Sequence, residues 1–160
     1  MSVAFTREDS AQTAQEVSLP ERPISQHPNI VTESGWTALE SAMGDARAAL
    51  EAAQRVEDAD ERRHAVDMAA RDVRYFNERL RTAQVFPPPV EFDSVAFGHR
   101  VTIQRDDGRR QIFRIVGEDE ADPRHQTISY VSPLARALTG KSVGDVVQMG
   151  GHDIEILAIA

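Results

Sequence analysis

Two long stretches of the chain repeat apolar residues at the spacing of a helical seam. In the first, the apolar positions follow alternating steps of three and four residues: Trp36, Leu39, Met43, Ala46, Leu50 and Ala53. The second stretch keeps the same steps: Val66, Ala69, Val73, Phe76, Leu80 and Ala83. Helices of matching length that are joined by a short polar link pack antiparallel. The pattern therefore predicts an antiparallel coiled-coil hairpin over residues 31–85, with Thr32 as the N-cap of its first helix.

Beyond residue 90 the apolar pattern changes from helical to alternating. We expect strands at residues 100–105, 111–116, 127–131, 143–149 and 154–159. Ser132 and Pro133 are typical of the N-cap and first residue of a helix, and Gly140 is typical of the position after a helix end. The pattern predicts an antiparallel sheet with one short helix, so that the whole chain has an α+β fold.

Prolines mark the two remaining segments. Pro87, Pro88 and Pro89 break any helix and favour a stiff linker at residues 86–89, which we take as the domain boundary. Residues 1–30 are polar, show no sustained period and are predicted to be a flexible N-terminal tail. The predicted order is therefore tail, hairpin over residues 31–85, linker, and β domain over residues 90–160.

Composition excludes several classes of protein. The 160 residues carry 26 acidic and 18 basic side chains, a net charge of −8, which argues against binding of nucleic acid by phosphate neutralisation. The chain has no cysteine, so disulfides and thiolate metal sites are excluded. Its apolar stretches are shorter than the roughly 20 residues of a membrane span, and the N-terminus lacks the signal-peptide pattern. We expect a cytoplasmic protein with no membrane contact and no sequence-specific binding of nucleic acid.

The common catalytic motifs are absent from the sequence. It contains no glycine-rich phosphate loop, no G-x-S-x-G and no H-E-x-x-H, and its five histidines are scattered. The acidic run at residues 118–122 is interpreted as a solvated loop. We therefore expect a protein that is not itself an enzyme and has no intrinsic cofactor.

Four carboxylates gather at the predicted turn of the hairpin: Glu57, Asp58, Asp60 and Glu61. Two interpretations of this cluster are open. Asp58 and Glu61 are candidate ligands of a divalent cation, which prefers oxygen donors. The same two residues also match a capping box, with Asp58 as the N-cap of the second helix and Glu61 three residues later.

The short predicted helix after residue 132 supports two interpretations as well. Leu134 and Leu138 are four residues apart, so both could fasten the helix to the sheet. Alternatively, the helix and its flanks form a docking patch for a partner. The candidate partner-binding residues are Ser132, Pro133, Leu134, Arg136 and Lys141.

Several stretches of the second half occur in an order that is specific when taken together: Phe97-Gly98-His99-Arg100-Val101-Thr102, Phe113-Arg114-Ile115-Val116-Gly117-Glu118-Asp119-Glu120-Ala121-Asp122, Ser132-Pro133-Leu134-Ala135-Arg136-Ala137-Leu138, Gly140-Lys141 and Val143-Gly144-Asp145-Val146-Val147. This order resembles the C-terminal domain of the Gre family of bacterial transcription elongation factors. The first half is similar too, at Val31-Thr32-Glu33-Ser34-Gly35, Val73-Arg74-Tyr75-Phe76 and Ala83-Gln84-Val85. The resemblance covers about residues 30–160.

The resemblance implies a coiled-coil hairpin followed by an FKBP-like α+β domain, and it implies bacterial RNA polymerase as the partner. In such factors the C-terminal domain docks at the rim of the polymerase secondary channel, and the coiled coil enters the channel. In cleavage-competent members, two acidic tip residues help to hold a second Mg²⁺ that activates water for hydrolysis of backtracked RNA. Asp58 and Glu61 are the positions that best match those acids, so Mg²⁺ would be held jointly with the polymerase.

The predicted tip departs from the Gly-Asp-x-x-Glu-Asn pattern of cleavage-competent members. Glu57 precedes Asp58, and Arg62 follows Glu61. Each helix is also shorter by roughly one heptad, which reduces the reach by about 10 Å, whereas metal ligation tolerates only tenths of an ångström. In this respect the chain resembles short-coil relatives such as Rnk and the Gre-homologue regulators.

Three functions follow as hypotheses. The first is a polymerase-binding regulator of elongation that lacks strong cleavage activity. The second is a Gre-type transcript-cleavage factor that uses Asp58 and Glu61 to rescue backtracked complexes. The third, of another class, is a stand-alone FKBP-like module for binding or isomerisation, although a fold analogy alone supplies no activity.

Overall fold

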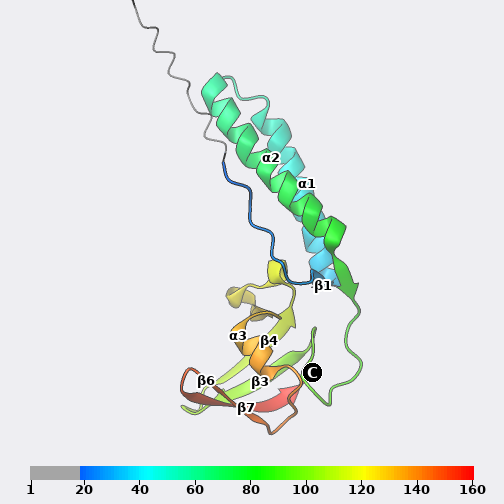
Figure 1. The fold of residues 1–160 in the computed structure, drawn as a ribbon, viewed down its shortest axis with the longest axis vertical. Coiled ribbons are helices and arrows are strands. Elements are labelled where there is room, and N and C mark those ends of the chain that lie inside the picture. Colours follow the sequence, from blue (N-terminus) through cyan, green and yellow to red (C-terminus); the bar gives the residue numbers. More distant parts are fainter. Residues whose placement is uncertain (1–18) are drawn as a thin grey trace, which may run out of the picture.

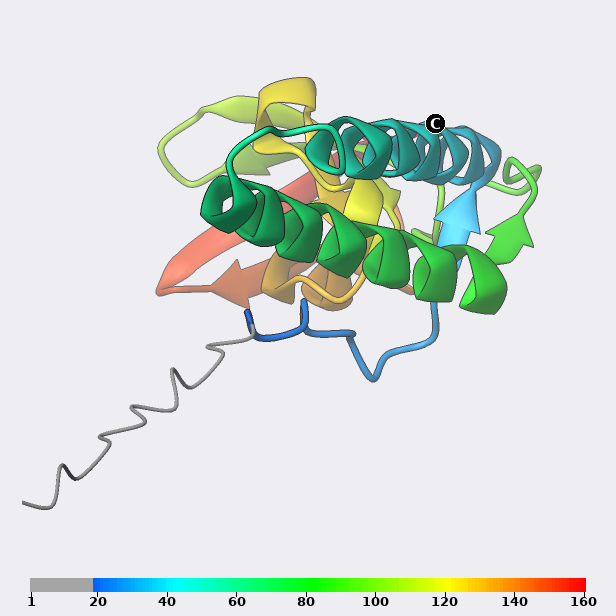
Figure 2. The same cartoon turned by 90° about the horizontal axis from the view of Figure 1, so that it is seen from above.

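A two-helix rod stands on a five-stranded sheet in the computed structural model, which describes residues 19–160 (Figure 1). The first helix is α1 (Glu33–Ala53) and the second is α2 (Ala59–Thr82), and they lie side by side along their lengths (Figures 1 and 2). Both predicted helices and their antiparallel arrangement are thereby confirmed. The predicted seam of α1 is largely buried, at Leu39, Met43, Ala46 and Ala53.

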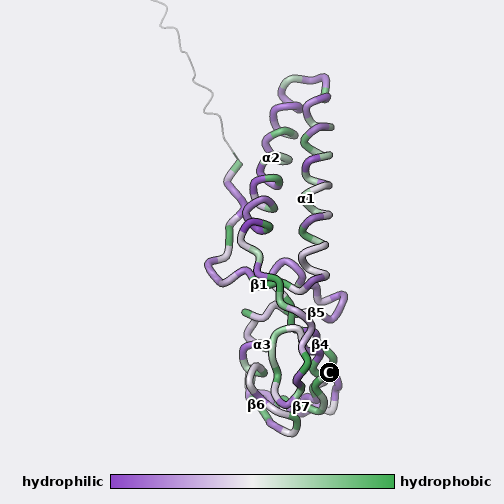
Figure 3. The backbone as a smooth tube through the Cα atoms, turned by 90° about the vertical axis from the view of Figure 1, so that its right-hand side faces the viewer, coloured by the Kyte–Doolittle hydropathy of each residue, from purple (hydrophilic) through white to green (hydrophobic). Residues whose placement is uncertain are grey.

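The helix α2 is more polar than α1 and buries less of its surface. Figure 3 shows mostly hydrophilic residues along α2, with hydrophobic residues recurring at intervals. Ala69 is the buried apolar residue of its seam, whereas Val73, Phe76 and Leu80 are half-buried. The other buried residue of α2 is Arg79, a charged side chain for which the apolar pattern gave no signal.

All five predicted strands of the second half are present. They are β3 (Arg100–Arg105), β4 (Arg110–Val116), β5 (Thr127–Ser129), β6 (Val146–Met149) and β7 (His152–Ile159), arranged in the order β5-β4-β3-β7-β6. The pairs β3–β4, β3–β7 and β6–β7 are antiparallel, as predicted.

The prediction of a wholly antiparallel sheet is wrong at one edge, where β5 pairs with β4 in parallel. Residues 117–126 separate these two strands and include two short 3₁₀ helices, η1 (Glu118–Glu120) and η2 (Pro123–His125). A tight hairpin turn would reverse the chain, but this longer connection carries it back only as far as Arg114, so that Thr127–Ser129 pair with the last three residues of β4. The strand β5 therefore runs in the same direction as β4.

A second, two-stranded sheet at the base of the rod was not predicted. It pairs β1 (Ile30–Thr32) with β2 (Gln84–Phe86) in parallel. Ile30 was placed at the end of the tail and Phe86 at the start of the linker, yet both are paired strand residues. Three residues are too few to show an alternating pattern, so no periodic signal marks these two strands.

The core of the second half lies between the sheet and α3 (Pro133–Leu138), which begins with the predicted N-cap Ser132. Leu134, Ala135 and Leu138 all belong to this core. The strand residues of the core are Val101, Ile103, Ile115, Val147, Ile154 and Ile156. The first interpretation of this helix, in which its leucines fasten it to the sheet, is confirmed.

Residues 19–29, which we call the strap, run beside α2 toward β1 (Figures 1 and 2). Arg22 pairs with Asp72 of α2 at 3.0 Å, and Asn29 is buried against the end of the same helix. The strap corrects the prediction of a flexible tail for these residues, while residues 1–18 of that prediction lie outside the described part of the chain. Across residues 19–160, neither α1 nor α2 nor α3 combines the length and apolar character that a membrane-crossing helix needs.

Candidate functional site

The acidic run at residues 118–122 joins the rod to the sheet, which corrects its interpretation as a solvated loop. Arg79 of α2 donates from Nε to Asp119 at 2.5 Å, and only 3% of the Arg79 side chain is exposed. The second carboxylate oxygen of Asp119 accepts a hydrogen bond from the Tyr75 hydroxyl at 2.5 Å. Asp119 therefore holds two residues of α2 against the edge of the sheet domain.

Glu120 makes the corresponding connection to α1. Its carboxylate accepts from the backbone N–H of Thr32 at 3.0 Å, from the Thr32 hydroxyl, and from the N–H of Gly117 at 3.2 Å. Thr32 is the N-cap of α1, as predicted, because its hydroxyl oxygen accepts from the N–H of Gly35. One side chain thus ties the start of α1 to the end of β4.

Two glycines make this approach possible. A Cβ atom on Gly35 would overlap the Glu120 carboxylate carbon, and a Cβ atom on Gly117 would lie 2.5 Å from the carbonyl oxygen of Ile30. A larger residue at Gly35 would displace the Glu120 carboxylate, and one at Gly117 would force the loop away from the backbone of Ile30. The junction therefore depends on small residues as well as on charge.

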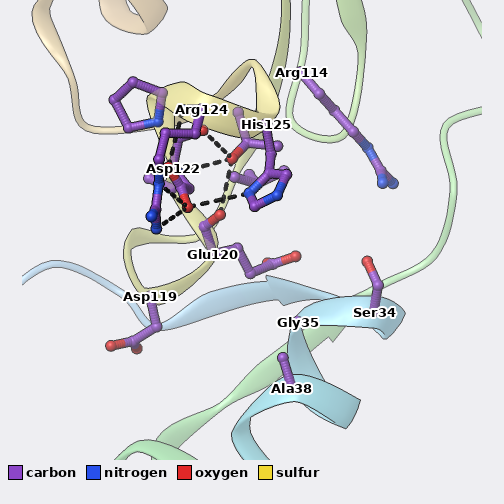
Figure 4. Close-up of a pocket in the computed structure, with 13 residues that line it drawn as sticks. Ser34, Gly35, Ala38, Arg114, Asp119, Glu120, Asp122, Arg124 and His125 are labelled. Atoms are coloured by element: carbon purple, nitrogen blue, oxygen red, sulfur yellow. Dashed lines mark hydrogen bonds and ion pairs between the residues drawn. The ribbon is translucent and has the colours of Figure 1, made fainter.

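A cavity of about 620 Å³ opens beside this junction (Figure 4). It is lined by the start of α1, by Asp119 and Glu120, and by charged residues of the connection to β5. Asp122 pairs there with Arg124 at 2.8 Å and with His125 at 3.1 Å, and the Arg124 guanidinium holds the pKa of the Asp122 carboxyl well below its usual range. Because these charges pair with one another, the cavity does not present a poised acid or base.

The hairpin tip lies at the opposite end of the rod. Asp58 is the N-cap of α2, since its Oδ1 accepts from the N–H groups of Asp60 at 3.0 Å and Glu61 at 2.9 Å. The cap of the predicted capping box is thus confirmed, although the hydrogen bonds of residues 19–160 do not include a return bond from the Asp58 N–H to the Glu61 carboxylate. Arg62 closes the turn by donating to the carbonyl oxygens of Val56 and Glu57.

The tip does not form a metal site by itself. Within the described residues 19–160, no three acidic or histidine side chains gather closely enough to hold a metal ion. Asp58 uses one carboxylate oxygen for the cap, and Glu61 is exposed. The tip acids could therefore serve only as part of a metal site that another molecule completes.

The structure separates the five candidate partner-binding residues into two groups. Leu134 is 9% exposed and lies in the core, so its side chain is not available to a partner without disrupting the sheet domain. Ser132 is used as the N-cap of α3 and accepts from the N–H of Ala135 at 3.2 Å. The remaining three, Pro133, Arg136 and Lys141, are exposed.

The junction residues were missed by sequence reasoning. Arg79 occupies a helix position where charged side chains are usually solvated, and Asp119 and Glu120 resemble any other acidic loop. The available signals were the glycine pair, Gly35 and Gly117, and the Gre-like stretches in which Thr32, Asp119 and Glu120 occur. The sequence did not indicate that these elements meet.

Comparison with known proteins gives consistent matches. A family model described as "Transcription elongation factor, GreA/GreB, C-term" matches residues 89–160. Transcription elongation factor GreB of Neisseria meningitidis is 42% identical over 95 residues, which cover 56% of this chain and 58% of that protein. The chain thus spans less than two thirds of that relative. GreB of Pasteurella multocida is 33% identical over 137 residues, covering 76% of this chain and 86% of that protein.

Among solved structures, GreA factor homolog 1 of Thermus thermophilus covers 84% of this chain and 99% of its own, with 21% identity and a TM-score of 0.40. This TM-score is too low for the likeness to support an argument about how the two parts of the molecule are arranged. The relationship to the GreA/GreB proteins therefore rests on the sequence matches.

The Gly35 contact predicts opposite effects for two glycine substitutions in the same helix. Gly35→Ala forces Glu120 to give up its bonds to Thr32 and Gly117, so we expect the free energy of unfolding to fall by about 1–3 kcal/mol. Gly44→Ala is the matched control, because a Cβ there meets no atom within 4 Å. It should raise the free energy by up to about 1 kcal/mol. Urea unfolding of both variants checks this; equal effects would contradict the proposed role of Gly35.

The contact between Tyr75 and Asp119 predicts an alkaline transition. Burial, together with the hydrogen bond to Asp119, raises the pKa of Tyr75 from 10.0 to about 12. Because the folded pKa is raised, the stabilisation is complete below about pH 10 and is lost as the pH rises through about 12. The free energy of unfolding should therefore fall less between these values in Tyr75→Phe than in wild type. An ultraviolet titration in which wild-type Tyr75 ionises near pH 10 would contradict this account.

Proposed function

The chain belongs to the GreA/GreB family of transcription elongation factors, and from this membership we propose that it binds bacterial RNA polymerase and regulates elongation from the secondary channel. The match to GreB of Pasteurella multocida carries the proposal, because it extends over 86% of that protein and therefore includes both rod and sheet domain. Binding to polymerase would place the protein in the cytoplasm. We also propose that the sheet domain is FKBP-like.

The proposal assigns docking to the sheet domain and channel occupancy to the rod. Pro133, Arg136 and Lys141 lie close in sequence around α3 and are exposed, so they can form a docking patch with a basic character. The rod is held at its base by Asp119 and Glu120, which fixes its direction relative to that patch. A partner that binds the patch would therefore receive the rod in a defined orientation.

Rod length sets how far the tip can reach. The 24 residues of α2 span about 36 Å at the helical rise. At the tip, Asp58 is engaged as a cap, Asp60 pairs with Arg63 at 3.7 Å, and Arg62 adds a positive charge. We propose that the rod acts by occupying the channel, that the protein is not itself an enzyme, and that it has no intrinsic cofactor.

Transcript cleavage is the second candidate, and the exposure of the tip favours it. Asp58 and Glu61 are both exposed at the end of the rod. In a complex, they could add carboxylate oxygens to a Mg²⁺ whose other ligands belong to the polymerase. That ion would supply activated water for RNA hydrolysis. For this, the rod would need to enter the polymerase channel more deeply than its length indicates.

Docking is tested by reversing one charge in the patch. Arg136→Glu should weaken binding to bacterial RNA polymerase by about tenfold or more, since a charge reversal at a contact is repulsive. The matched control is Arg109→Glu at the β3–β4 turn, a residue that is also exposed and should change affinity by no more than about twofold. Equal affinities of wild type and Arg136→Glu would remove this patch from the proposal.

Cleavage is tested with isosteric variants at the tip. Asp58→Asn preserves the helix cap, because asparagine caps as well as aspartate, and Glu61→Gln preserves size. The double variant should bind polymerase as wild type does, and both should leave stalled, backtracked complexes uncleaved in the presence of Mg²⁺. Strong cleavage by wild type that the double variant loses would instead establish the second candidate.

A further inference from the structure

The strap carries an arginine between two prolines, in the sequence Pro20-Glu21-Arg22-Pro23. Its guanidinium lies over the Tyr75 ring, 3.7 Å from the ring centroid, and 5.0 Å from the centroid of Phe76. It also pairs with Asp72 at 3.0 Å. Aromatic faces and a carboxylate are the partners that a planar guanidinium prefers.

These three α2 residues, Asp72, Tyr75 and Phe76, form what we call the arginine cradle. Around it, Arg74 pairs with Glu21 at 2.6 Å and Arg71 donates to the carbonyl oxygen of Pro20. A cavity of about 260 Å³ lies beside the cradle, with Arg22, Phe76 and residues at the start of α1 in its walls. The strap thus fits a shaped surface through side-chain and backbone contacts.

The two ends of the strap are held very differently. At its C-terminal end, Asn29 is 5% exposed and donates to the carbonyl oxygen of Arg79 at 2.7 Å, while Pro28 accepts from the Tyr130 hydroxyl at 2.6 Å. At the other end, the side chains of Glu21 and Arg74 are 62% and 56% exposed. Exposed ion pairs contribute little to stability, so this end can release while the other stays anchored.

We propose that the arginine cradle is a peptide-recognition site for an extended segment with an arginine flanked by prolines, and that residues 20–23 occupy it in cis as a releasable ligand. Proline-rich segments are already extended, so they lose little conformational entropy when they dock on an aromatic surface. A strap anchored at Asn29 stays at a high effective concentration over the cradle. A partner segment of the same chemistry would compete for this face of α2.

The first test follows release of the strap in the full chain. Cleavage at Glu21 by a glutamate-specific protease should be about fivefold faster in Asp72→Asn than in wild type, because the guanidinium loses its charged partner while the cleavage site is unchanged. Asp45→Asn on α1, an exposed residue away from the strap contacts, is the matched control and should cleave at the wild-type rate. Equal rates for Asp72→Asn and wild type would overturn the proposed role of the cradle.

The second test asks whether the cradle recognises a peptide in trans. A synthetic peptide of residues 19–26 is added to the full-length Arg22→Ala protein, whose own strap lacks the ligand. We expect nuclear magnetic resonance shifts at Asp72, Tyr75 and Phe76, and binding at least about fivefold tighter than to wild type, where the strap competes.

A peptide with alanine in place of its arginine should produce no shifts, and circular dichroism should show that the Arg22→Ala protein is folded. Absence of shifts with the arginine peptide, or equal binding of the two peptides, would overturn the inference. Neither test contains polymerase, so the inference stands or falls independently of the proposed function.

Discussion

The buried pair of Arg79 and Asp119 is the interaction on which the arrangement of the molecule depends. The Arg79 guanidinium is almost fully covered. Removal of one member of a buried pair lowers the free energy of unfolding by about 3–5 kcal/mol, because the other charge is left without a partner. Glu120, the next residue, accepts from the backbone N–H of Thr32, the N-cap of the other helix. Two adjacent acids therefore hold both helices of the rod on one edge of the sheet.

This constraint links the two ends of the molecule to which we assign functions by proposal. The exposed residues around α3 and the acidic tip lie on separate elements, so a partner that contacts both requires a fixed angle between rod and sheet domain. The strap crosses the same region, since its buried end bonds both the end of α2 and Tyr130 of the sheet domain. The orientation of the exposed α3 residues, the reach of the rod tip and the position of the strap therefore all depend on the same junction.

The sequence predicted the parts of this fold that are periodic or that carry strong local signals. The heptad seams predicted both helices and the alternating stretches predicted five strands. Ser132 was predicted as a cap, and a cap was one of the two interpretations of Asp58. The parallel pairing of β5, the two short strands at the base and the junction ion pair were not predicted. Each depends on contacts between residues far apart in the chain, such as Arg79 with Asp119, which have no local pattern.

The most direct test of the account is a double-mutant cycle on the junction pair, with Arg79→Met and Asp119→Asn. The asparagine keeps an oxygen that can accept from Tyr75, so the cycle isolates the contact with Arg79. Urea unfolding of the four proteins should give a coupling free energy of at least about 1 kcal/mol, as expected for residues in direct contact. Additivity of the two substitutions to within about 0.5 kcal/mol would contradict the claim that this pair holds the rod on the sheet domain.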